Sequence, residues 1–339
     1  MPSIGLPYAA YKRSRPLLIN SESVPMPIPR RRTAVAAALL AAAACGRDDP
    51  ALGRHVEHPD FPADAAWAFL LDQVAIGPRY AGTKPHDRAA RWLRDQLELR
   101  ADSVAVDSFV YRTAEGKRVT MTNFFARYRP GDARRILLVA HWDTYPKAEE
   151  SADPYDRRLP VAGANSGASG TALLLAVAEA LRQQAPPIGV DLLLTDGDDF
   201  ERGKLLGTAR FLERRPAGYR PAFALVFDRV ADRDPWLPQD AASRRDAAAI
   251  VRRVWGIARQ LRRDSIFAVD AVPDSAGPHA LLSAAGIPAV LVADPVLGPG
   301  NSYWHTVNDL PTQASRETLG LVGEVVTEVV YRGIPEEGR

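Results

Sequence analysis

Four short apolar runs constrain this chain most, because they alternate with stretches of helical periodicity. The runs read RILLVAHWDT, GVDLLLTDGDD, AFALVFD and IPAVLVAD, and the apolar part of each is almost uninterrupted. Such runs are typical of strands that are buried on both faces of a sheet. Helices between consecutive strands would cross over the sheet. The sequence therefore predicts an α/β fold, a single domain with a mixed, mostly parallel central sheet and helices on both faces.

The rest of the chain adds a pair of strands and several helices to this pattern. Residues 102–112 and 119–128 alternate in the manner of two strands. Helices are expected at 63–76, 86–99, 171–183, 206–214, 241–261 and 315–331. Internal repeats and a second domain are not apparent. The formal net charge of +2 gives no electrostatic reason for binding nucleic acid, so we expect no nucleic-acid partner. We expect the chain to be a monomer.

The N-terminal segment is typical of an exported protein. Three arginines precede an apolar run at residues 34–44, and Cys45, the one cysteine of the chain, follows it. A membrane span takes about 20 residues, so this run is too short to be one. Its charge, apolar core and small-residue ending match a secretory signal. Met26, rather than Met1, would begin a signal of ordinary length.

The ending AAAC resembles a bacterial lipoprotein box, in which the cysteine is lipidated and becomes the new N-terminus. A plain cleaved signal with an incidental cysteine is the alternative. We therefore expect residues 1–45 to be a leader, residues 46–60 a polar tether and residues 61–335 the folded domain. The expected location is the periplasm or the cell envelope, with a lipidated Cys45 as the only attachment to a membrane.

Polar side chains follow the four apolar runs at the ends where α/β sheets gather their ligands. They are His141 and Asp143, then Asp196, Asp198 and Asp199, then Asp228, and finally His305 in YWHTVND. His141 and Asp143 lie two residues apart on an extended backbone, so the carboxylate can orient the imidazole. Imidazoles and carboxylates that converge in this way predict a zinc site.

Each of these residues has a simpler explanation when it is taken alone. His141 and His305 could be surface histidines, and the aspartates at 196–199 could form a solvated turn. Asp228 could cap the segment that follows it, and Trp304 could be a packing residue. The joint pattern is what favours a metal site.

The glycine-rich loop VAGANSGASG, residues 161–170, precedes an apolar helix. Such a loop could cradle a phosphate on its N–H groups, but no Lys–Ser/Thr pair follows it as in a P-loop. Ser166 and Ser169 do not lie in the G-x-S-x-G turn of a serine hydrolase. A loop that presents one side chain to a metal is the remaining alternative, with Ser166 where a carboxylate is expected.

Together, the motifs resemble those of the zinc exopeptidase superfamily that contains the double-zinc aminopeptidases and the glutaminyl cyclases. GPRYAGT, HWDT, GANSGASG, DGDD, FDRVAD, HALLSAAGIP and YWHTVND occur in the family's order over most of residues 64–332. The resemblance is nearer to the bacterial glutaminyl-cyclase-like branch, because the aromatic Trp304 directly precedes His305. It implies the same mixed sheet with helices on both sides, and it implies that residues 61–335 are a zinc-peptidase-like catalytic domain.

The resemblance also implies a role for each matching residue. The metal ligands would be His141, Asp199, Asp228 and His305. Asp143 would orient the first of these, Asp198 would be the general base, and Trp304 would form an aromatic wall that holds the substrate.

Three departures from the family pattern bear on these roles. Ser166 replaces an aspartate that binds zinc, and that bridges the two ions in aminopeptidases; a neutral hydroxyl is a poor zinc ligand. We therefore expect zinc with one ion per chain. Asp198 is about one methylene shorter than the family's glutamate, although a general base works within about 2.6–3.2 Å. Gly277, Pro278 and His279 stand where the family often has Asp-Asp-His, so an acid that cyclases use is missing.

The resemblance implies an exported zinc-dependent enzyme that acts on peptides with a free N-terminus, an acyltransferase of the glutaminyl-peptide cyclotransferase type. The first alternative is a zinc aminopeptidase, a hydrolase of the same superfamily. The second is a catalytically degenerate member that binds peptides or sugars. The loss at Ser166 counts more against hydrolysis, because activating water depends on an intact metal site. The missing acid at Gly277 counts against cyclisation.

Overall fold

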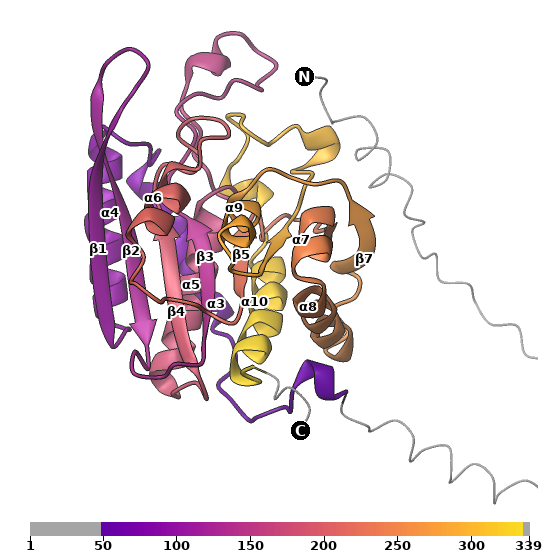
Figure 1. Cartoon of the computed structure of the whole chain (residues 1–339). Helices are drawn as coiled ribbons and strands as arrows, with labels where there is room; N and C mark the ends of the chain where they lie inside the picture. Colours follow the sequence, from indigo (N-terminus) through magenta and orange to yellow (C-terminus); the bar gives the residue numbers. More distant parts are fainter. Residues whose placement is uncertain (1–48, 335–339) are drawn as a thin grey trace, which may run out of the picture.

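The computed structural model describes residues 49–334, so the expected leader and Cys45 lie outside the described residues. Its centre is a six-stranded sheet in the order β1-β2-β4-β3-β5-β8 (Figure 1). Neighbouring strands run parallel from β4 to β8, and β1 and β2 add two antiparallel pairings. The strands are β1 (Ser103–Arg112), β2 (Arg118–Tyr128), β3 (Arg135–His141), β4 (Gly189–Thr195), β5 (Ala224–Asp228) and β8 (Ala289–Ala293). The predicted mixed, mostly parallel sheet is confirmed.

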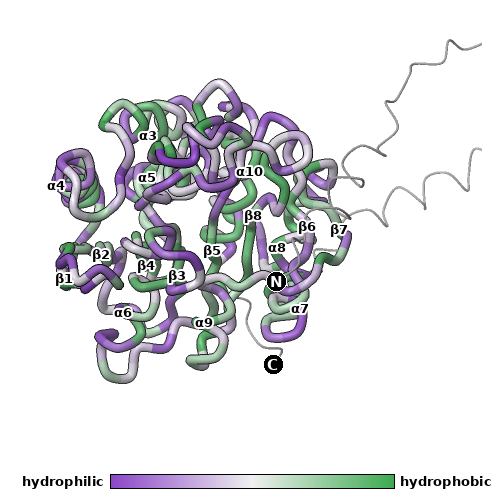
Figure 2. Tube along the Cα trace, turned by 90° about the horizontal axis from the view of Figure 1, so that it is seen from above, coloured by the Kyte–Doolittle hydropathy of each residue, from purple (hydrophilic) through white to green (hydrophobic). Residues whose placement is uncertain are grey.

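Helices cover both faces of this sheet. Figure 2 shows α3, α4, α5 and α10 on one side of the strands, and α6, α7 and α9 on the other. The helices are α3 (Ala63–Ile76), α4 (Lys84–Glu98), α5 (Ala168–Gln183), α6 (Leu206–Arg214), α7 (Ala241–Asp246), α8 (Ala248–Gln260), α9 (Pro278–Ala284) and α10 (Arg316–Tyr331). Two further strands, β6 (Leu237–Asp240) and β7 (Phe267–Val272), form a small parallel sheet.

The central strands explain the uninterrupted apolar runs. All seven residues of β3 are buried, as are all seven of β4. Along β3, Ile136 and Leu138 join the larger core with α5 and α10, while Leu137 and Val139 join a smaller core with α6 and α9. Side chains alternate between the faces of a strand, so a strand covered on both sides needs apolar residues at every position.

The region 241–261 differs from the expected single helix. Its backbone leaves the helical conformation at Ala247, where φ is −142° and ψ is 39°, and this break separates α7 from α8. The side chain of Asp240 caps α7 by accepting the N–H of Ser243 at 2.8 Å. The elements β6, β7 and α9 were not predicted, because they are short and carry polar residues.

Residues 49–60, which are expected to belong to a polar tether, contact the domain at several points. After the short helix η2 (Pro50–Leu52), this segment packs on the domain. Leu52 is buried against α8, where a side chain at Gly256 would overlap it. Among the described residues, no helix combines the length and the hydropathy that crossing a membrane requires.

Candidate active site

Arg79 holds the glycine-rich loop against the carboxyl end of β3. Its buried guanidinium donates hydrogen bonds to the backbone oxygens of Trp142, Ala162 and Gly163 at 3.1, 3.0 and 2.8 Å. Burial lowers the pKa of Arg79 to about 10, so the group stays charged at neutral pH. It therefore fixes two segments that are twenty residues apart, and the motif GPRYAGT, which contains it, was the sequence signal for this role.

The glycine-rich loop approaches the strand end closely. Gly167 has φ +89°, and a Cβ there would lie 2.5 Å from the backbone oxygen of Asp143 and 3.4 Å from Cε1 of His141. Only glycine adopts this conformation without strain and leaves room for the contact. The chain path of the loop thus places Ser166 beside the end of β3.

His141 ends β3 and lies between two carboxylates. Its Nε2 is 3.3 Å from Oδ1 of Asp228, which ends the neighbouring β5, and its Nδ1 is 3.4 Å from Oδ1 of Asp143. Burial opposes protonation of His141, but the two carboxylates outweigh burial and raise its pKa. Burial likewise opposes ionisation of Asp228, but the charge of Arg229 and the contact with His141 hold its pKa well below the usual range.

A second imidazole–carboxylate pair joins the loop after β4 to the segment before α10. Nε2 of His305 lies 3.1 Å from Oδ1 of Asp199. Asp143 connects the two pairs, because its Oδ2 accepts the backbone N–H of Asp199 at 3.0 Å. His305 has φ +52°, a left-handed conformation that is uncommon outside glycine and is often found at functional sites. We call His141, Asp228, Asp199 and His305 the strand-end site.

Two aromatic rings stack on the imidazole of His305. Tyr145 stacks on one side with ring centres 4.2 Å apart, and Trp304 stacks with ring centres 4.0 Å apart. The guanidinium of Arg202 lies over the Trp304 ring, 5.1 Å from its centre. His305 is buried and Trp304 is half-buried, so the indole has surface left for another molecule. Tyr145 directly follows the motif HWDT and was not among the predicted site residues.

Ser166 is fixed through its backbone. Asp309 accepts the N–H groups of Asn165 and Ser166 at 2.7 and 3.0 Å. Burial raises the pKa of Asp309 to about 6, although these two hydrogen bonds oppose the rise. Asp309 ends the motif YWHTVND, which was the signal for this second residue that sequence reasoning missed.

Asp198 turns toward α6. Thr208 donates its backbone N–H to one carboxylate oxygen at 2.9 Å and its hydroxyl to the other at 2.5 Å. Burial raises the pKa of the Asp198 carboxyl, although the hydrogen bonds from Thr208 oppose the rise. The structure thus gives Asp198 a partner that the resemblance did not imply, and leaves each oxygen with spare acceptor capacity.

The missing acid before α9 is not replaced by its neighbours. Nε2 of His279 lies 3.1 Å from Oδ1 of Asp240, and the imidazole is buried there. Asp274 is exposed and pairs with Arg245 at 3.0 Å. These two residues are therefore engaged with partners outside the strand-end site.

The donors of the strand-end site fit zinc in chemistry. Each pair offers one imidazole nitrogen and one carboxylate oxygen, the ligand types that zinc takes alongside thiolate. His141 has a carboxylate on each side, so one ring nitrogen can donate to Asp143 while the other binds a metal. Among residues 49–334, however, no three ligand atoms of this site lie within 4.8 Å of one another. The site consists of two pairs rather than one three-ligand cluster.

The fold and these pairs define an α/β protein of the zinc exopeptidase type. The comparison with family models agrees, because residues 123–330 match the model for peptidase family M28. This match covers more than half of the chain, and the chain therefore belongs to peptidase family M28.

Solved structures extend the similarity over the whole domain. A Zn-dependent exopeptidase from Parabacteroides distasonis is 31% identical, with a TM-score of 0.77 over 81% of this chain and 99% of that one. Tannerella forsythia glutaminyl cyclase is also 31% identical, with a TM-score of 0.76 over 80% and 99%. A leucine aminopeptidase precursor from Bacteroides thetaiotaomicron is 29% identical, with a TM-score of 0.75 over 81% and 99%.

Curated relatives match over a shorter stretch. The alkaline phosphatase isozyme conversion protein of Escherichia coli is 28% identical over 145 residues, which are 40% of this chain and 41% of that protein. The uncharacterized protein YfbL of Escherichia coli is 30% identical over 154 residues, 39% and 45% of the two chains. The matches thus span less than half the length of these relatives.

Proposed function

We propose that the chain is a zinc-dependent enzyme that acts at the N-termini of peptides, of the glutaminyl-peptide cyclotransferase type. The observation that carries this proposal is the stack of Trp304 on His305, which pairs with Asp199 at the strand ends. Similarity to a bacterial glutaminyl cyclase over 99% of that protein's length supports the same activity.

In this proposal the strand-end residues hold zinc, which when bound polarises the carbonyl group that is attacked. Trp304 lies against the substrate side chain. The α-amine of the substrate attacks its own glutamine side-chain carbonyl, a C–N bond forms, and ammonia leaves. Asp198 takes a proton from the amine and passes it to the leaving nitrogen.

We infer one zinc ion at the strand-end site, because Ser166 lacks the charge that a bridging carboxylate would supply for a second ion. His305 and Asp199 are the ligands we assign to this ion, because their 3.1 Å contact adjoins the aromatic wall. His141 and Asp228 then form a second pair that Asp143 orients.

An aminopeptidase is the second candidate, because the His141–Asp228 pair is retained and lies at 3.3 Å. Similarity to a leucine aminopeptidase precursor supports it as well. The third candidate, a peptide- or sugar-binding protein without catalysis, is supported by Ser166 and by the absence of an acid at Gly277.

Two assays on the zinc-loaded chain separate these candidates. Ammonia release from peptides that begin with glutamine is expected, and Asp199→Asn should abolish it, because this variant keeps the shape of the side chain and removes its charge. Hydrolysis of amino-acid anilides without ammonia release would support the aminopeptidase instead. Inactivity in both assays would contradict an enzyme and favour the binding protein.

We further propose that the chain is exported and is anchored through a lipidated Cys45. The apolar run before this cysteine supports the proposal. Metabolic labelling with palmitate tests it: the label should appear on the wild-type chain and be absent from Cys45→Ser. Export without label would leave a plain cleaved signal as the explanation.

A further inference from the structure

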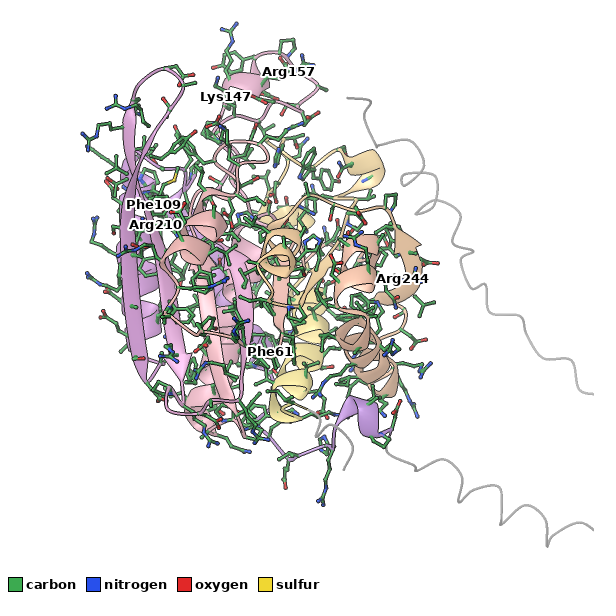
Figure 3. The ribbon with its side chains drawn as sticks, in the orientation of Figure 1. Phe61, Phe109, Lys147, Arg157, Arg210 and Arg244 are labelled. Atoms are coloured by element: carbon green, nitrogen blue, oxygen red, sulfur yellow. The ribbon has the colours of Figure 1, made fainter. Side chains whose placement is uncertain are left out.

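A second group of metal-ligating side chains lies at the other end of the molecule. In Figure 1, η2 lies at the lower edge, close to the C-terminal end of α10, whereas the loop after β3 lies at the upper end. Figure 3 marks the same separation, with Lys147 and Arg157 of that loop at the top and Phe61 far below them. His55 and His58 follow η2 in the chain, and Glu328 lies in the C-terminal part of α10.

The three side chains point their ligand atoms at one another. Nδ1 of His55 lies 2.8 Å from Oε1 of Glu328, and Nε2 of His58 lies 2.8 Å from Oε2. One ligand atom from each residue can be chosen so that all three lie within 4.8 Å of one another. Within residues 49–334, no other group of three or more histidine, cysteine or acidic side chains meets this distance.

His58 is held in the orientation that a metal ligand needs. Its Nδ1 lies 2.9 Å from the backbone oxygen of Pro59, which can only accept, so this nitrogen carries a proton. Nε2 is thereby aimed at Glu328, where a metal ion would take the place of the proton that Nε2 donates to the carboxylate. Metal-binding histidines commonly donate their other ring N–H to a backbone oxygen in this way. The ring also stacks on Tyr331, with centres 4.9 Å apart.

Glu328 is a buried carboxylate, and three cationic or imidazole groups approach its two oxygens: His55, His58 and Arg332. Arg332 contacts Oε1, the same oxygen that His55 approaches, so Oε2 is left to His58 and to a further partner.

We propose that His55, His58 and Glu328 bind a divalent cation, with zinc as the preferred ion. Two imidazole nitrogens and one carboxylate oxygen are a ligand set that zinc accepts, and water can complete the tetrahedron. The side chain of His55 is 62% exposed, so the fourth position opens to solvent. The cation links residues 55–58 to α10, the last helix of the domain.

The packing around this cluster indicates how a bound cation would stabilise the folded chain. Phe61 lies against α10 where a side chain at Gly323 would overlap it, and Leu52 is buried against α8. The cation would therefore close a loop of about 270 residues between two segments that already touch. Closing a loop of that length removes conformational freedom mainly from the unfolded chain, and so raises the melting temperature.

Cobalt(II), which takes the same ligands and absorbs visible light, tests the proposal. The probe is Co²⁺ alone, titrated into the full chain carrying His141→Ala and His305→Ala, which disable the strand-end site. One Co²⁺ per chain is expected, with the absorption of a tetrahedral complex. Adding His55→Ala should weaken binding at least tenfold, and because His55 is exposed this change leaves the core intact.

Glu57→Gln is the matched control, because Glu57 is exposed in the same segment and lies outside the cluster. Adding Glu57→Gln should leave the Co²⁺ affinity of the His141→Ala, His305→Ala chain unchanged. Zinc should also raise the melting temperature of the parent and fail to do so after His55→Ala. If the His141→Ala, His305→Ala chain does not fold, the same titration is made on the wild-type chain. His55→Ala should then lower the number of Co²⁺ ions bound per chain by one. Cobalt binding that is absent, or unchanged by His55→Ala, would overturn the proposal.

Discussion

The carboxylate of Asp309 accepts the backbone N–H of Ser166 at a distance of 3.0 Å. The same carboxylate accepts the N–H of Asn165, so the glycine-rich loop is fixed at the position where the family's metal-binding aspartate is absent. The backbone of the loop is therefore fixed whatever side chain stands at position 166.

Ser166→Asp should raise the zinc affinity of the strand-end site at least tenfold, which is about 1.4 kcal/mol of binding free energy. The new carboxylate restores, in this loop, the charged oxygen ligand that the family resemblance implies. The measurement is a zinc titration in a chain that also carries His55→Ala, so that only the strand-end site is counted. Ser166→Asn has the size of aspartate without its charge and should change little. Equal effects of Asp and Asn would contradict the prediction.

Arg79→Met should lower the free energy of unfolding by about 3 kcal/mol or more, because several buried backbone oxygens lose a charged donor. Arg88→Met is the control: Arg88 is exposed and donates one hydrogen bond, to the backbone oxygen of Ile76, so the expected loss is below about 1 kcal/mol. Urea unfolding followed by circular dichroism compares the two. Similar losses would mean that Arg79 does not hold the loop.

Trp304→Ala should lower kcat/KM for glutamine-initiated peptides by a factor of about 10 to 100, because both the substrate wall and the ring stacked on His305 are removed. Trp304→Phe keeps an aromatic ring and should retain most of the activity. Steady-state kinetics on zinc-saturated protein gives the comparison. If alanine and phenylalanine behave alike, the aromatic wall has no part in binding.

Asp240→Asn should make the free energy of unfolding less dependent on pH in acid. Burial opposes ionisation of Asp240, but hydrogen bonds from His279, Ser243 and Ser275 lower its pKa to about 2. The pKa of Asp240 is lower in the folded chain than its unfolded value near 3.9, so the ionised carboxylate stabilises the folded chain by about 2 kcal/mol at higher pH. This stabilisation is lost as the pH falls toward about 2. Urea unfolding at a series of pH values measures the slope.

Asp274→Asn serves as the control for this experiment, because Asp274 is exposed beside Arg245. Its acid slope between pH of about 4 and about 2 should match that of the wild-type chain. If the free energy of unfolding of Asp240→Asn falls with pH as steeply as that of the wild-type chain, Asp240 is not the source of the acid dependence.

The central strands and the order of the motifs could be predicted because their signals are local. A strand buried on both faces is apolar at each position, as in the stretch from Ile136 to Ala140, and a motif such as YWHTVND is contiguous. The family, the sheet and its mixed pairing followed from these signals. The roles of the individual site residues remain proposals.

What the sequence did not predict depends on partners that are distant in the chain. Asp198 is turned toward Thr208, and His279 is paired with Asp240 from another element. The break between α7 and α8 depends on how this region packs, since the residues around Ala247 are compatible with a continuous helix. Residues 49–60 are polar in composition, yet they pack on the domain through a glutamate some 270 residues away.

Anomalous scattering at the zinc edge, from crystals of the zinc-loaded chain, tests the central claim most directly. The account predicts an anomalous peak in contact with Nε2 of His305 and a carboxylate oxygen of Asp199, whatever further peak lies near His58. Electron density for an ordered chain with no anomalous peak at His305 and Asp199 would contradict it.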